Sequence, residues 1–541
     1  MNNEKKQIIL NWLKQQEETD SLTQEQRDIF ALIRESLHTK KYGLVFEEKE
    51  EDIVKETNDS ILTLKQKDLI IVNNNAKELN YLLEGDNYQA LKLLQKTHRN
   101  RIDVIYIDPP YNTGNKDFIY NDAYVDSEDG FHHSKWLSFM KKRLELAKTL
   151  LTENGVIFIS IDDNEQAQLK LLCDEIFGEN NFVADFIRKT KSTTNDIKTG
   201  ANIQHENCLC YAKNKSVINL LGGEKDLTRY TNPDNDPNGP WISADPSAKS
   251  GTEKNNYFAV VNPYTGKEDF PPKGMYWRFS ISTINKHIKD GIIYFKKEHK
   301  ENERGFIYKR YLNNLKSTKK TINSLDFTTN EYMNQVATKE AKTLDFVEDF
   351  QYPKPMVFIH KLLLHSTELN SIILDFFAGS GTTGHAVAKL NADDGGNRTY
   401  ILCTNNEHNI CENVTFKRLS NIQDELPHNL IYQQIETINK DEFIVSNYNQ
   451  KYLDQLEESS KQLAQLELGK LIDNKEIFFI TSQDELENAN EDDLLNATVI
   501  FMNENKVDPY RSKVYDHIKN KIIIIPDNYY EKELKETDYL W

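Results

Sequence analysis

Apolar and polar positions follow two periods along the chain. Apolar residues stand three and four positions apart over 136–151, which predicts an amphipathic helix, and helical spacing also begins near residue 88 and runs through 165–177. Short apolar runs at 104–107 and 156–161 have the length and β-branched content of buried strands. Strands that alternate with helices in this way predict a parallel α/β sheet.

This alternation stops near residue 187 and resumes near 347. The residues between are rich in Gly, Pro, Asn and aromatic side chains, as in "TNPDNDPNGPW", and predict an irregular, loop-rich insert. Beyond the insert we predict a helix at 356–364, a strand at 372–375 that leads through a Gly-rich loop into a helix, and a strand at 399–407. The sheet is therefore predicted to be built from two separate stretches of chain.

The two ends of the chain carry no catalytic motif. The first 75 residues alternate helical periodicity with polar stretches, and the tail holds helices and apolar runs at 477–480, 497–502 and 522–525, which predict a small α/β domain. The predicted segments are an N-terminal helical region, 1–75, a first sheet half, 76–187, an insert, 188–346, a second sheet half, 347–420, and a C-terminal domain, 421–541.

Composition restricts the class of protein. A chain of 541 residues is long enough for several units, and its mean hydropathy of −0.68 and 38% apolar residues suit a soluble protein. No apolar run approaches the length of a membrane span, and the N-terminus predicts an amphipathic helix instead of a signal peptide. The five cysteines form no CxxC pair, which disfavours a disulfide framework or zinc site and predicts a reducing, cytoplasmic compartment.

Charge is distributed unevenly. The net charge is −18, yet residues 181–320 hold 24 Lys and Arg against 15 Asp and Glu, while residues 421–541 are strongly acidic. A basic middle part is suited to contact with phosphates, and the acidic parts would face solvent or another protein. The alternative is a chance excess in a lysine-rich sequence.

The segment "LDFFAGSGTTG", 374–384, places a Gly-rich loop between a strand and a helix. Gly379 and Gly381 allow a tight turn and a close approach to a ligand, and the following helix offers free N–H groups. With Gly384 the glycines also satisfy G-x-G-x-x-G, so a dinucleotide or a simple tight turn stays open. Asp375 at the strand end would repel a pyrophosphate but suits a ligand with an ammonium and a sulfonium, such as S-adenosylmethionine.

The strand at 104–107 ends in Asp108-Pro109-Pro110-Tyr111. The simple interpretation is a strand terminated by prolines, with the aspartate as a turn residue. The chemical interpretation is that these residues bind the exocyclic amine of a base. Asp108 and the Pro109 carbonyl would accept its two hydrogens, and the prolines would keep both acceptors in a fixed direction. Tyr111 would stack on a base swung out of the duplex. Methyl transfer is then direct displacement at the sulfonium carbon.

The two motifs together resemble those of the DNA amino-methyltransferases, and their order, with the catalytic motif first and a long insert before the Gly-rich loop, resembles the circularly permuted β class. The segments "LLEGDNYQALKLL", "IDVIYIDPPYNTGN", "WLSFMKKRLELAKTLL" and "GVIFISIDDNE" further resemble the modification (Mod) subunits of type III restriction–modification systems. The resemblance implies an α/β, Rossmann-like methyltransferase fold that uses S-adenosylmethionine, with an inserted target-recognition domain and a small C-terminal α/β domain.

The resemblance also assigns roles to residues. It implies that the Gly-rich loop contacts the methionine part of the cofactor, that Glu407 binds the ribose and Asp86 the adenine, and that Lys354 lines the methionine end. The implied cofactor residues are Asp86, Lys354, Asp375, Phe376, Gly379, Gly381 and Glu407. Simpler roles stay open: Asp86 as a helix N-cap, Lys354 as a solvated lysine and Glu407 as a turn residue.

Within the insert, "NPYTGKEDFPPKGMYWRFS" resembles the target-recognition segment of that family. Basic and aromatic residues there are candidates for contacts with base edges and phosphates. The candidates are Trp277, Arg278, Lys296, Lys297, Lys309 and Arg310. Trp277 has core packing as its alternative, and the lysines have a solvated face.

Other patterns are weaker. We interpret 162–165 as a solvated cap instead of a metal site, His132-His133 as loop, and Cys208 with Cys210 as core. No P-loop or nuclease cluster is present, so cleavage would need another subunit. The resemblance implies double-stranded DNA as substrate, N6 of adenine as acceptor, a homodimer, and an ATP-dependent restriction (Res) subunit as partner. Cytosine-N4 methylation, where serine is commoner in place of Asp108, a pure DNA-specificity module and RNA methylation remain as alternatives.

Overall fold

The computed structural model describes residues 12–13, 30, 44–72, 78–114, 117–121, 123–126, 129–194, 200–348, 350, 352–446, 449–537 and 539. The chain forms two compact units. One contains residues 1–219 and 323–541, and the other, 220–322, is the larger part of the predicted insert. Each unit is described by itself.

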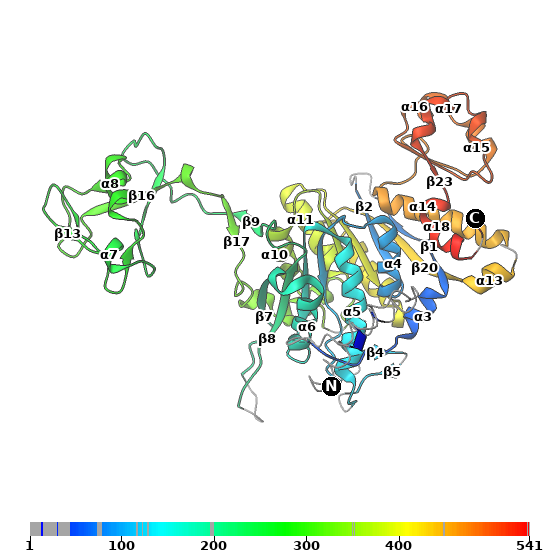
Figure 1. Ribbon diagram of the computed structural model, residues 1–541, viewed down its shortest axis with the longest axis horizontal. Helices are drawn as coiled ribbons and strands as arrows, with labels where there is room; N and C mark the ends of the chain where they lie inside the picture. The colour runs from blue at the N-terminus through cyan, green and yellow to red at the C-terminus, as the bar shows by residue number, and fades with distance from the viewer. Residues whose placement is uncertain are drawn as a thin grey trace. The chain divides into compact units, whose positions relative to one another are not determined.

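The first unit is built on a nine-stranded sheet (Figure 1). Six consecutive strands run parallel, whereas β1 pairs antiparallel with β20 and β8 pairs antiparallel with both of its neighbours. The parallel α/β sheet is therefore confirmed. In spatial order the strands are β1 (Ser60–Ile71), β20 (Asn429–Asn439), β2 (Leu79–Glu84), β19 (Thr399–Thr404), β18 (Ile372–Asp375), β3 (Ile102–Ile107), β6 (Leu151–Ile161), β8 (His205–Ala212) and β7 (Phe182–Lys189).

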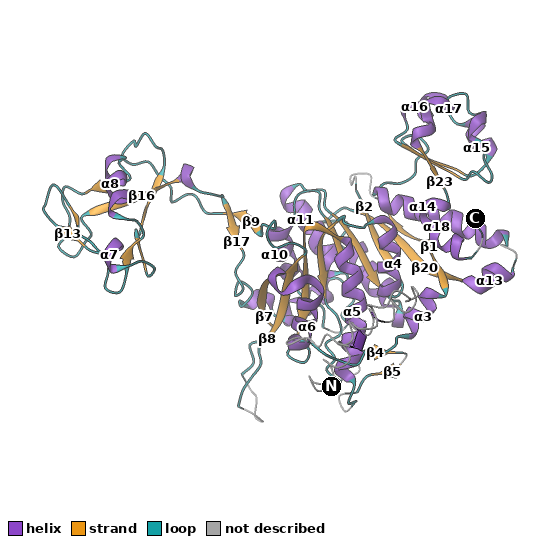
Figure 2. Ribbon diagram, in the orientation of Figure 1, coloured by secondary structure: helices purple, strands orange, loops and turns teal. Residues whose placement is uncertain are grey.

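Helices cover both faces of this sheet (Figure 2). One face carries α4 (Asn87–Thr97), α5 (His132–Leu150) and α6 (Gln166–Cys173), and the other carries α10 (Met356–Ser366), α11 (Thr382–Asp394) and α12 (Lys417–Asn421). The apolar spacing predicted for α5 is the reason for its orientation, since Leu137, Met140 and Leu144 are all buried in the main core. Burial of such side chains on both faces stabilises the sheet by about 25 cal/mol per Å² of apolar surface.

The order of the strands confirms the predicted permutation. Strand β18, from the second half of the chain, lies between β19 and β3, with Ile373 opposite Val104 and Leu374 opposite Ile105. The connection from β18 continues to β19 on one side, and that from β3 continues to β6 on the other. In open α/β sheets such a switch point is where a crevice forms at the carboxyl ends of the strands.

Three predicted boundaries are wrong. Residues 60–71 belong to the sheet as β1 and not to a helical region. Residues 205–212 form strand β8 of the sheet instead of part of the insert, which begins at 220, and 429–439 form β20 instead of part of a separate C-terminal domain. Each misplaced segment is an edge of the sheet, or next to one, and its register depends on partners far away in the sequence. The other predictions for residues 1–43 lie almost entirely outside the described residues.

The three apolar runs of the tail form the parallel sheet β21 (Ile477–Ile480), β22 (Val499–Met502) and β23 (Ile522–Ile524), as predicted. Its helices are α15 (Gln483–Asn488), α16 (Glu491–Asn496) and α17 (Tyr515–Ile518). The flanking helices α14 (Gln450–Leu468) and α18 (Asp527–Glu536) join the main core through Leu463 and Leu534. The remaining elements of this unit are α3 (Asp52–Asn58), β4 (Ile119–Tyr120), β5 (Ala123–Tyr124), α9 (Asn334–Thr343) and α13 (Lys440–Val445).

The second unit, 220–322, consists of short strands around a small aromatic core. Trp277, Phe306 and Ile284 are buried together there. Its elements are β9 (Leu221–Glu224), β10 (Trp241–Ala244), β11 (Ser247–Ala248), α7 (Glu253–Asn256), β12 (Val260–Val261), β13 (Glu268–Asp269), β14 (Tyr276–Trp277), α8 (Ile281–Lys289), β15 (Ile293–Phe295), β16 (Phe306–Tyr311) and β17 (Lys319–Thr321). In the part of the chain that is described, no helix is both long and apolar enough to cross a membrane.

All five cysteines are free thiols in buried positions. Burial also raises the pKa of the Cys411 thiol to about 12, so the reactive thiolate is scarce even where a reagent reaches it. We expect a thiol reagent such as Ellman's reagent to label fewer than one cysteine per folded chain at pH 8 and all five in guanidinium chloride. Rapid labelling of two or more cysteines in the native protein would contradict this packing.

Candidate functional site

Two acidic side chains lie at the carboxyl ends of neighbouring parallel strands. Asp108 follows β3 directly, and Asp375 is the last residue of β18. Because β3 and β18 are paired in register, motifs separated by more than 260 positions in the sequence meet at one edge of the sheet. The Asp108 carboxylate is partly exposed at this edge, whereas Asp375 is buried.

The loop after β3 is held in place by its neighbours. The indole Nε1 of Trp136, a fully buried residue of α5, donates to the carbonyl of Pro110 at 2.7 Å. Asn112 has a positive φ of 58° and donates through Nδ2 to Glu165 Oε1 at 2.5 Å. Two prolines and two tertiary anchors therefore fix the direction of the Asp108 and Pro109 acceptors before any ligand arrives.

Asp108 is engaged by two groups. The ammonium Nζ of Lys354 donates to both carboxylate oxygens, at 2.8 and 2.6 Å, and the Tyr111 hydroxyl donates to Oδ1 at 3.0 Å. The same ammonium lies 5.0 Å from the centre of the Tyr111 ring and 3.8 Å from Glu206 Oε1. Lys354 is only 9% exposed, so the solvated-lysine alternative is wrong.

The Gly-rich loop turns between β18 and α11. Gly379 and Gly381 have φ of +46° and +73°, and a Cβ at Gly381 would lie 3.1 Å from the Thr415 methyl group. The Asp375 carboxylate accepts from the Phe377 backbone N–H at 3.0 Å and from the Thr383 hydroxyl at 2.5 Å. Burial raises the pKa of Asp375 to about 7, because these two hydrogen bonds only partly offset the loss of solvent.

The predicted cofactor residues follow one edge of the sheet. Asp86 follows β2, Glu407 comes three residues after β19, Asp375 ends β18, and these three strands are neighbours. The buried Asp375 carboxyl group beside glycines that leave little room for a Cβ suits a ligand with an ammonium and a sulfonium, since nearby cations favour its ionised form, so these residues fit S-adenosylmethionine. Phe376 contributes through packing, since it is buried in the main core.

The alternatives for two of these residues are realised in the structure. Asp86 is the N-cap of α4, where its side chain accepts from the Tyr88 N–H at 2.7 Å, and it also lies 3.5 Å from Arg143. Glu407 is an exposed residue of a 3₁₀ turn. Both carboxylates keep exposed surface at the edge where the predicted ligand would lie.

One weak pattern is predicted correctly except at Glu165, and another is wrong. At 162–165 the first three residues form a solvated turn and Glu165 is the N-cap residue of α6, but its side chain is fully buried and contacts Asn112 and, at 2.7 Å, Nδ1 of His133. His132 and His133 begin α5 instead of lying in a loop. Burial raises the pKa of Glu165 to about 8, and Asn112 opposes this shift only in part. Among the described residues, no group of His, Cys, Asp and Glu has the arrangement of a metal site.

The structure separates the predicted DNA contacts into two sets. Trp277 is fully buried in the insert's own core and donates from Nε1 to Phe258 O, so its assignment to DNA is wrong. Lys309 is only 4% exposed and is neutralised by Asp234 and Asp236. Lys296 is half-buried and paired with Glu303. The exposed members of the predicted set are Arg278, Lys297 and Arg310.

Sequence analysis missed two residues next to the Asp108 loop. Glu206 on β8 and Arg188 on β7 are both buried and form an ion pair of 2.7 Å. Burial would raise the pKa of Glu206, but Arg188 and Lys354 outweigh it and hold that pKa below its usual value. Both residues lie in the stretch interpreted as the start of the insert, and the apolar run at the end of β8 was the signal that this stretch contains a buried strand.

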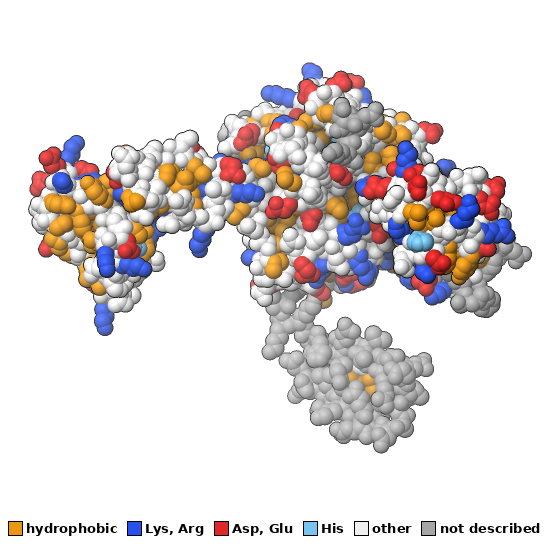
Figure 3. Space-filling view, turned by 90° about the horizontal axis from the view of Figure 1, so that it is seen from above, with side chains coloured by type: hydrophobic (Ala, Val, Ile, Leu, Met, Phe, Trp, Pro, Cys, Tyr) orange, Lys and Arg blue, Asp and Glu red, His pale blue; other side chains and the backbone are white. Residues whose placement is uncertain are grey.

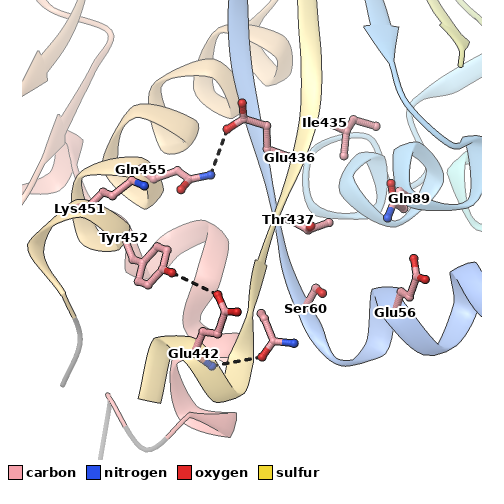
Figure 4. A pocket seen from close by; sticks show the side chains of 11 residues that line it. Glu56, Ser60, Gln89, Ile435, Glu436, Thr437, Glu442, Lys451, Tyr452 and Gln455 are labelled. Carbon is pink, nitrogen blue, oxygen red and sulfur yellow. Dashed lines mark hydrogen bonds between the residues drawn. The ribbon is translucent and has the colours of Figure 1, made fainter. Parts of the chain in front are cut away.

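A separate cavity of about 740 Å³ lies elsewhere on the same unit (Figure 4). Polar side chains line it, with Gln455 bonded to Glu436 and Tyr452 to Glu442. Strands β2, β19 and β18 separate its strand β20 from β3. Since it contains none of the predicted site residues, we do not assign the cavity to the site at Asp108.

Comparison with known proteins gives the class. The DNA methylase family matches residues 102–458, more than half of the chain and a range that includes both motifs. The chain therefore belongs to the DNA methylase family, as the two motifs predicted.

Two kinds of relative are similar to this chain. It is 36% identical to the Mod subunit of the type III restriction–modification enzyme StyLTI of Salmonella typhimurium, over 61% of this chain and 53% of that protein, and 34% identical to the EcoPI Mod subunit of Escherichia phage P1, over 62% and 58%. It is 33% identical to the type II methyltransferase M.KpnI of Klebsiella pneumoniae, over 65% and 90%. The chain spans a little over half the length of the Mod subunits.

Solved structures also align with the chain. A DNA modification methylase from Thermus thermophilus matches with a TM-score of 0.31 and 13% identity, over 65% of this chain and 99% of that one. The PvuII cytosine-N4-specific DNA methyltransferase matches with a TM-score of 0.31 and 12% identity, over 66% and 98%.

The buried Glu165 predicts a pH dependence of stability. Its pKa is about 8 in the folded chain and ordinary when unfolded, so its contribution is full below about pH 4.5 and is lost as pH rises through 8. We expect Glu165→Gln, measured by urea unfolding, to lose about 3 kcal/mol less stability than the wild type between pH 5.5 and 9. The exposed Glu153→Gln serves as control and should follow the wild type. Equal pH dependence in all three proteins would contradict the assignment.

Proposed function

We propose that the chain is an S-adenosylmethionine-dependent methyltransferase that modifies N6 of adenine in double-stranded DNA, as the modification subunit of a type III system. The observation that carries this proposal is the pairing of β3 with β18, which brings the Asp108 loop and the Gly-rich loop to adjacent strand ends. An acceptor for an amine and a cradle for a methyl donor are then within one crevice.

The chain's own residues would hold the amine. Asp108 accepts one amino hydrogen, and the Pro109 carbonyl, which receives no hydrogen bond from the described residues, accepts the other. These two acceptors draw the nitrogen toward tetrahedral geometry and turn its lone pair out of the ring, because both are fixed in direction before the base arrives. Tyr111, beside Asp108, offers its ring to the flipped base.

The cofactor would lie along the edge formed by the ends of β2, β19 and β18. Gly379 and Gly381 allow close approach of the backbone, Asp375 balances the positive groups, and Glu407 and Asp86 reach the ribose and adenine ends. When bound, S-adenosylmethionine would supply an electrophilic methyl carbon, which the nitrogen held at Asp108 would attack while the carbon–sulfur bond breaks and the thioether leaves. The proton lost from the nitrogen passes toward the Asp108 carboxylate.

The insert, 220–322, would read the DNA. Its exposed cations Arg278, Lys297 and Arg310 can contact phosphates or base edges. On the side seen in Figure 3, basic, acidic and apolar side chains are interspersed on the insert, which suits contacts of mixed character better than a purely electrostatic surface.

Adenine and the type III assignment are supported by separate facts. Asp108, where a serine is commoner for cytosine-N4 methylation, favours adenine. The Mod subunits among the relatives favour a type III system with a homodimer and a Res partner, although M.KpnI, a type II methyltransferase, keeps a solitary enzyme as the second candidate. Cytoplasmic DNA would be the substrate in either system.

The proposed function predicts which base is modified. We expect single-molecule sequencing of DNA from cells expressing this chain to show N6-methyladenine on one strand of a short asymmetric site. A palindromic site methylated on both strands would keep the enzyme but contradict the type III assignment, and N4-methylcytosine would contradict adenine.

The proposed function also predicts the effect of replacing Asp108. Asp108→Ala should lower methyl transfer by at least a thousandfold, because the amine loses the acceptor that reshapes it, while filter binding shows DNA affinity within about threefold of the wild type. Asp117→Ala, in the same loop region but bonded to the Thr113 backbone N–H, is the matched control and should keep most of the activity. Parallel loss of binding and methylation in Asp108→Ala would contradict the division of roles between catalytic loop and insert.

A further inference from the structure

Four charged side chains of alternating sign form a continuous path to the catalytic loop. Lys354 Nζ contacts the Asp108 carboxylate at 2.6 Å and Glu206 Oε1 at 3.8 Å, and Arg188 Nε donates to that same Oε1 at 2.7 Å. Lys354, Glu206 and Arg188 are each less than 10% exposed. In such surroundings each charge depends strongly on its partner.

The far end of this path is fixed where the chain returns from the insert. Arg188 donates from Nη1 to the Tyr332 carbonyl at 2.6 Å and from Nη2 to Asn334 Oδ1 at 2.8 Å. With three hydrogen bonds and burial, the guanidinium is held in one orientation. Glu206 is thereby a fixed, ionised carboxylate that already has one cationic partner and lies within reach of a second.

The near end of the path conflicts with catalysis as proposed. The target amine must donate a hydrogen bond to Asp108, yet both oxygens of that carboxylate already accept from Lys354. The Tyr111 hydroxyl adds a third bond and holds the ring beneath the ammonium. A carboxylate has few acceptor directions, so the base and the ammonium compete for them.

We propose that Lys354 is a displaceable stand-in for the target's amino group: its ammonium holds Asp108 until a base enters, and then transfers to Glu206. This inference rests on the proposed function and adds to it a positioning lysine and a receiving carboxylate, neither of which touches the reacting atoms. The backbone of Lys354 stays in place during the transfer, since its carbonyl accepts from the Thr382 hydroxyl at 3.4 Å and Pro355 follows it.

The exchange would add to base selectivity. An exocyclic amine replaces the hydrogen bonds that Asp108 gives up when the ammonium leaves. A base with a carbonyl at that position cannot, because two acceptors would face each other and the carboxylate would keep the Tyr111 hydroxyl as donor but lose both bonds from the ammonium. Lys354 therefore returns to Asp108 when the wrong base is presented.

A double-mutant cycle on the full-length chain tests this inference. Methyl transfer from radiolabelled S-adenosylmethionine is measured on unmodified bacterial genomic DNA, and KM for DNA is separated from kcat. Lys354→Met should lower KM for DNA about threefold or more, since the base no longer competes with an ammonium. Glu206→Gln should raise KM for DNA about tenfold, because the ammonium loses its receiving carboxylate and stays on Asp108.

The two substitutions should not be additive. In the Lys354→Met background, Glu206→Gln should change KM less than twofold, because there is no ammonium left to receive. Asp185→Asn, a carboxylate on β7 that contacts Asn207 and Gln166 and lies outside the path, is the matched control and should leave KM unchanged in both backgrounds.

Each contrary result is distinct. An equal effect of Glu206→Gln on KM in both backgrounds would show a purely structural role for Glu206 and would overturn the inference. An unchanged or raised KM for DNA in Lys354→Met would also overturn it, and this second test does not require the Glu206 variant to fold. Methylation by the wild type in either case keeps the proposed function. A wild-type chain that binds S-adenosylmethionine but methylates no DNA would overturn the proposed function and this inference with it.

Discussion

The backbone pairing of β18 with β3 is the constraint on which the rest of the site depends. Two strands that are far apart in the sequence are neighbours in the sheet, and because they are parallel their carboxyl ends lie at one edge. The Asp108 loop and the Gly-rich loop are short extensions of those ends, so their relative position is fixed by backbone hydrogen bonds and not by the loops themselves. A site placed on a sheet edge in this way has a geometry that does not depend on the fold of the insert.

The loop that carries Asp108 is rigid, whereas the inference above requires the ion-pair partner of its carboxylate to be exchangeable. The prolines, Trp136 and the Asn112–Glu165 contact keep the loop rigid, which preserves acceptor directions. The partners of the carboxylate are different in kind, since an ion pair between side chains can be exchanged for another without moving the backbone. Lys354 lies between two carboxylates, and the fixed Arg188 makes the second of them a stable partner. On the inference above, the ammonium therefore keeps a carboxylate partner throughout, and the incoming amine replaces its hydrogen bonds to Asp108.

The sequence predicted those parts of the fold that depend on local pattern. Apolar periodicity predicted α5, β3 and β18 nearly within their bounds, whereas β6 begins at Leu151, earlier than predicted, and the three apolar runs of the tail predicted its small α/β domain. The predictions failed at β1, β8 and β20, whose assignment depends on pairing with distant strands. Trp277 and Lys309 were misassigned for a similar reason, because residue type alone does not reveal that an indole is enclosed in a core or that two aspartates surround an ammonium.

By itself the sequence determined the two motifs, Asp108-Pro109-Pro110-Tyr111 and the Gly379 and Gly381 turn, and the family that both motifs indicate. These signals are local, since each depends on residues within a few positions of one another. Only the tertiary structure decided which side chains act on those motifs. The contacts of Lys354, Glu206 and Arg188 with one another and with Asp108 join four segments of chain, and such contacts are set by the packing of the sheet and leave no periodic trace in the sequence.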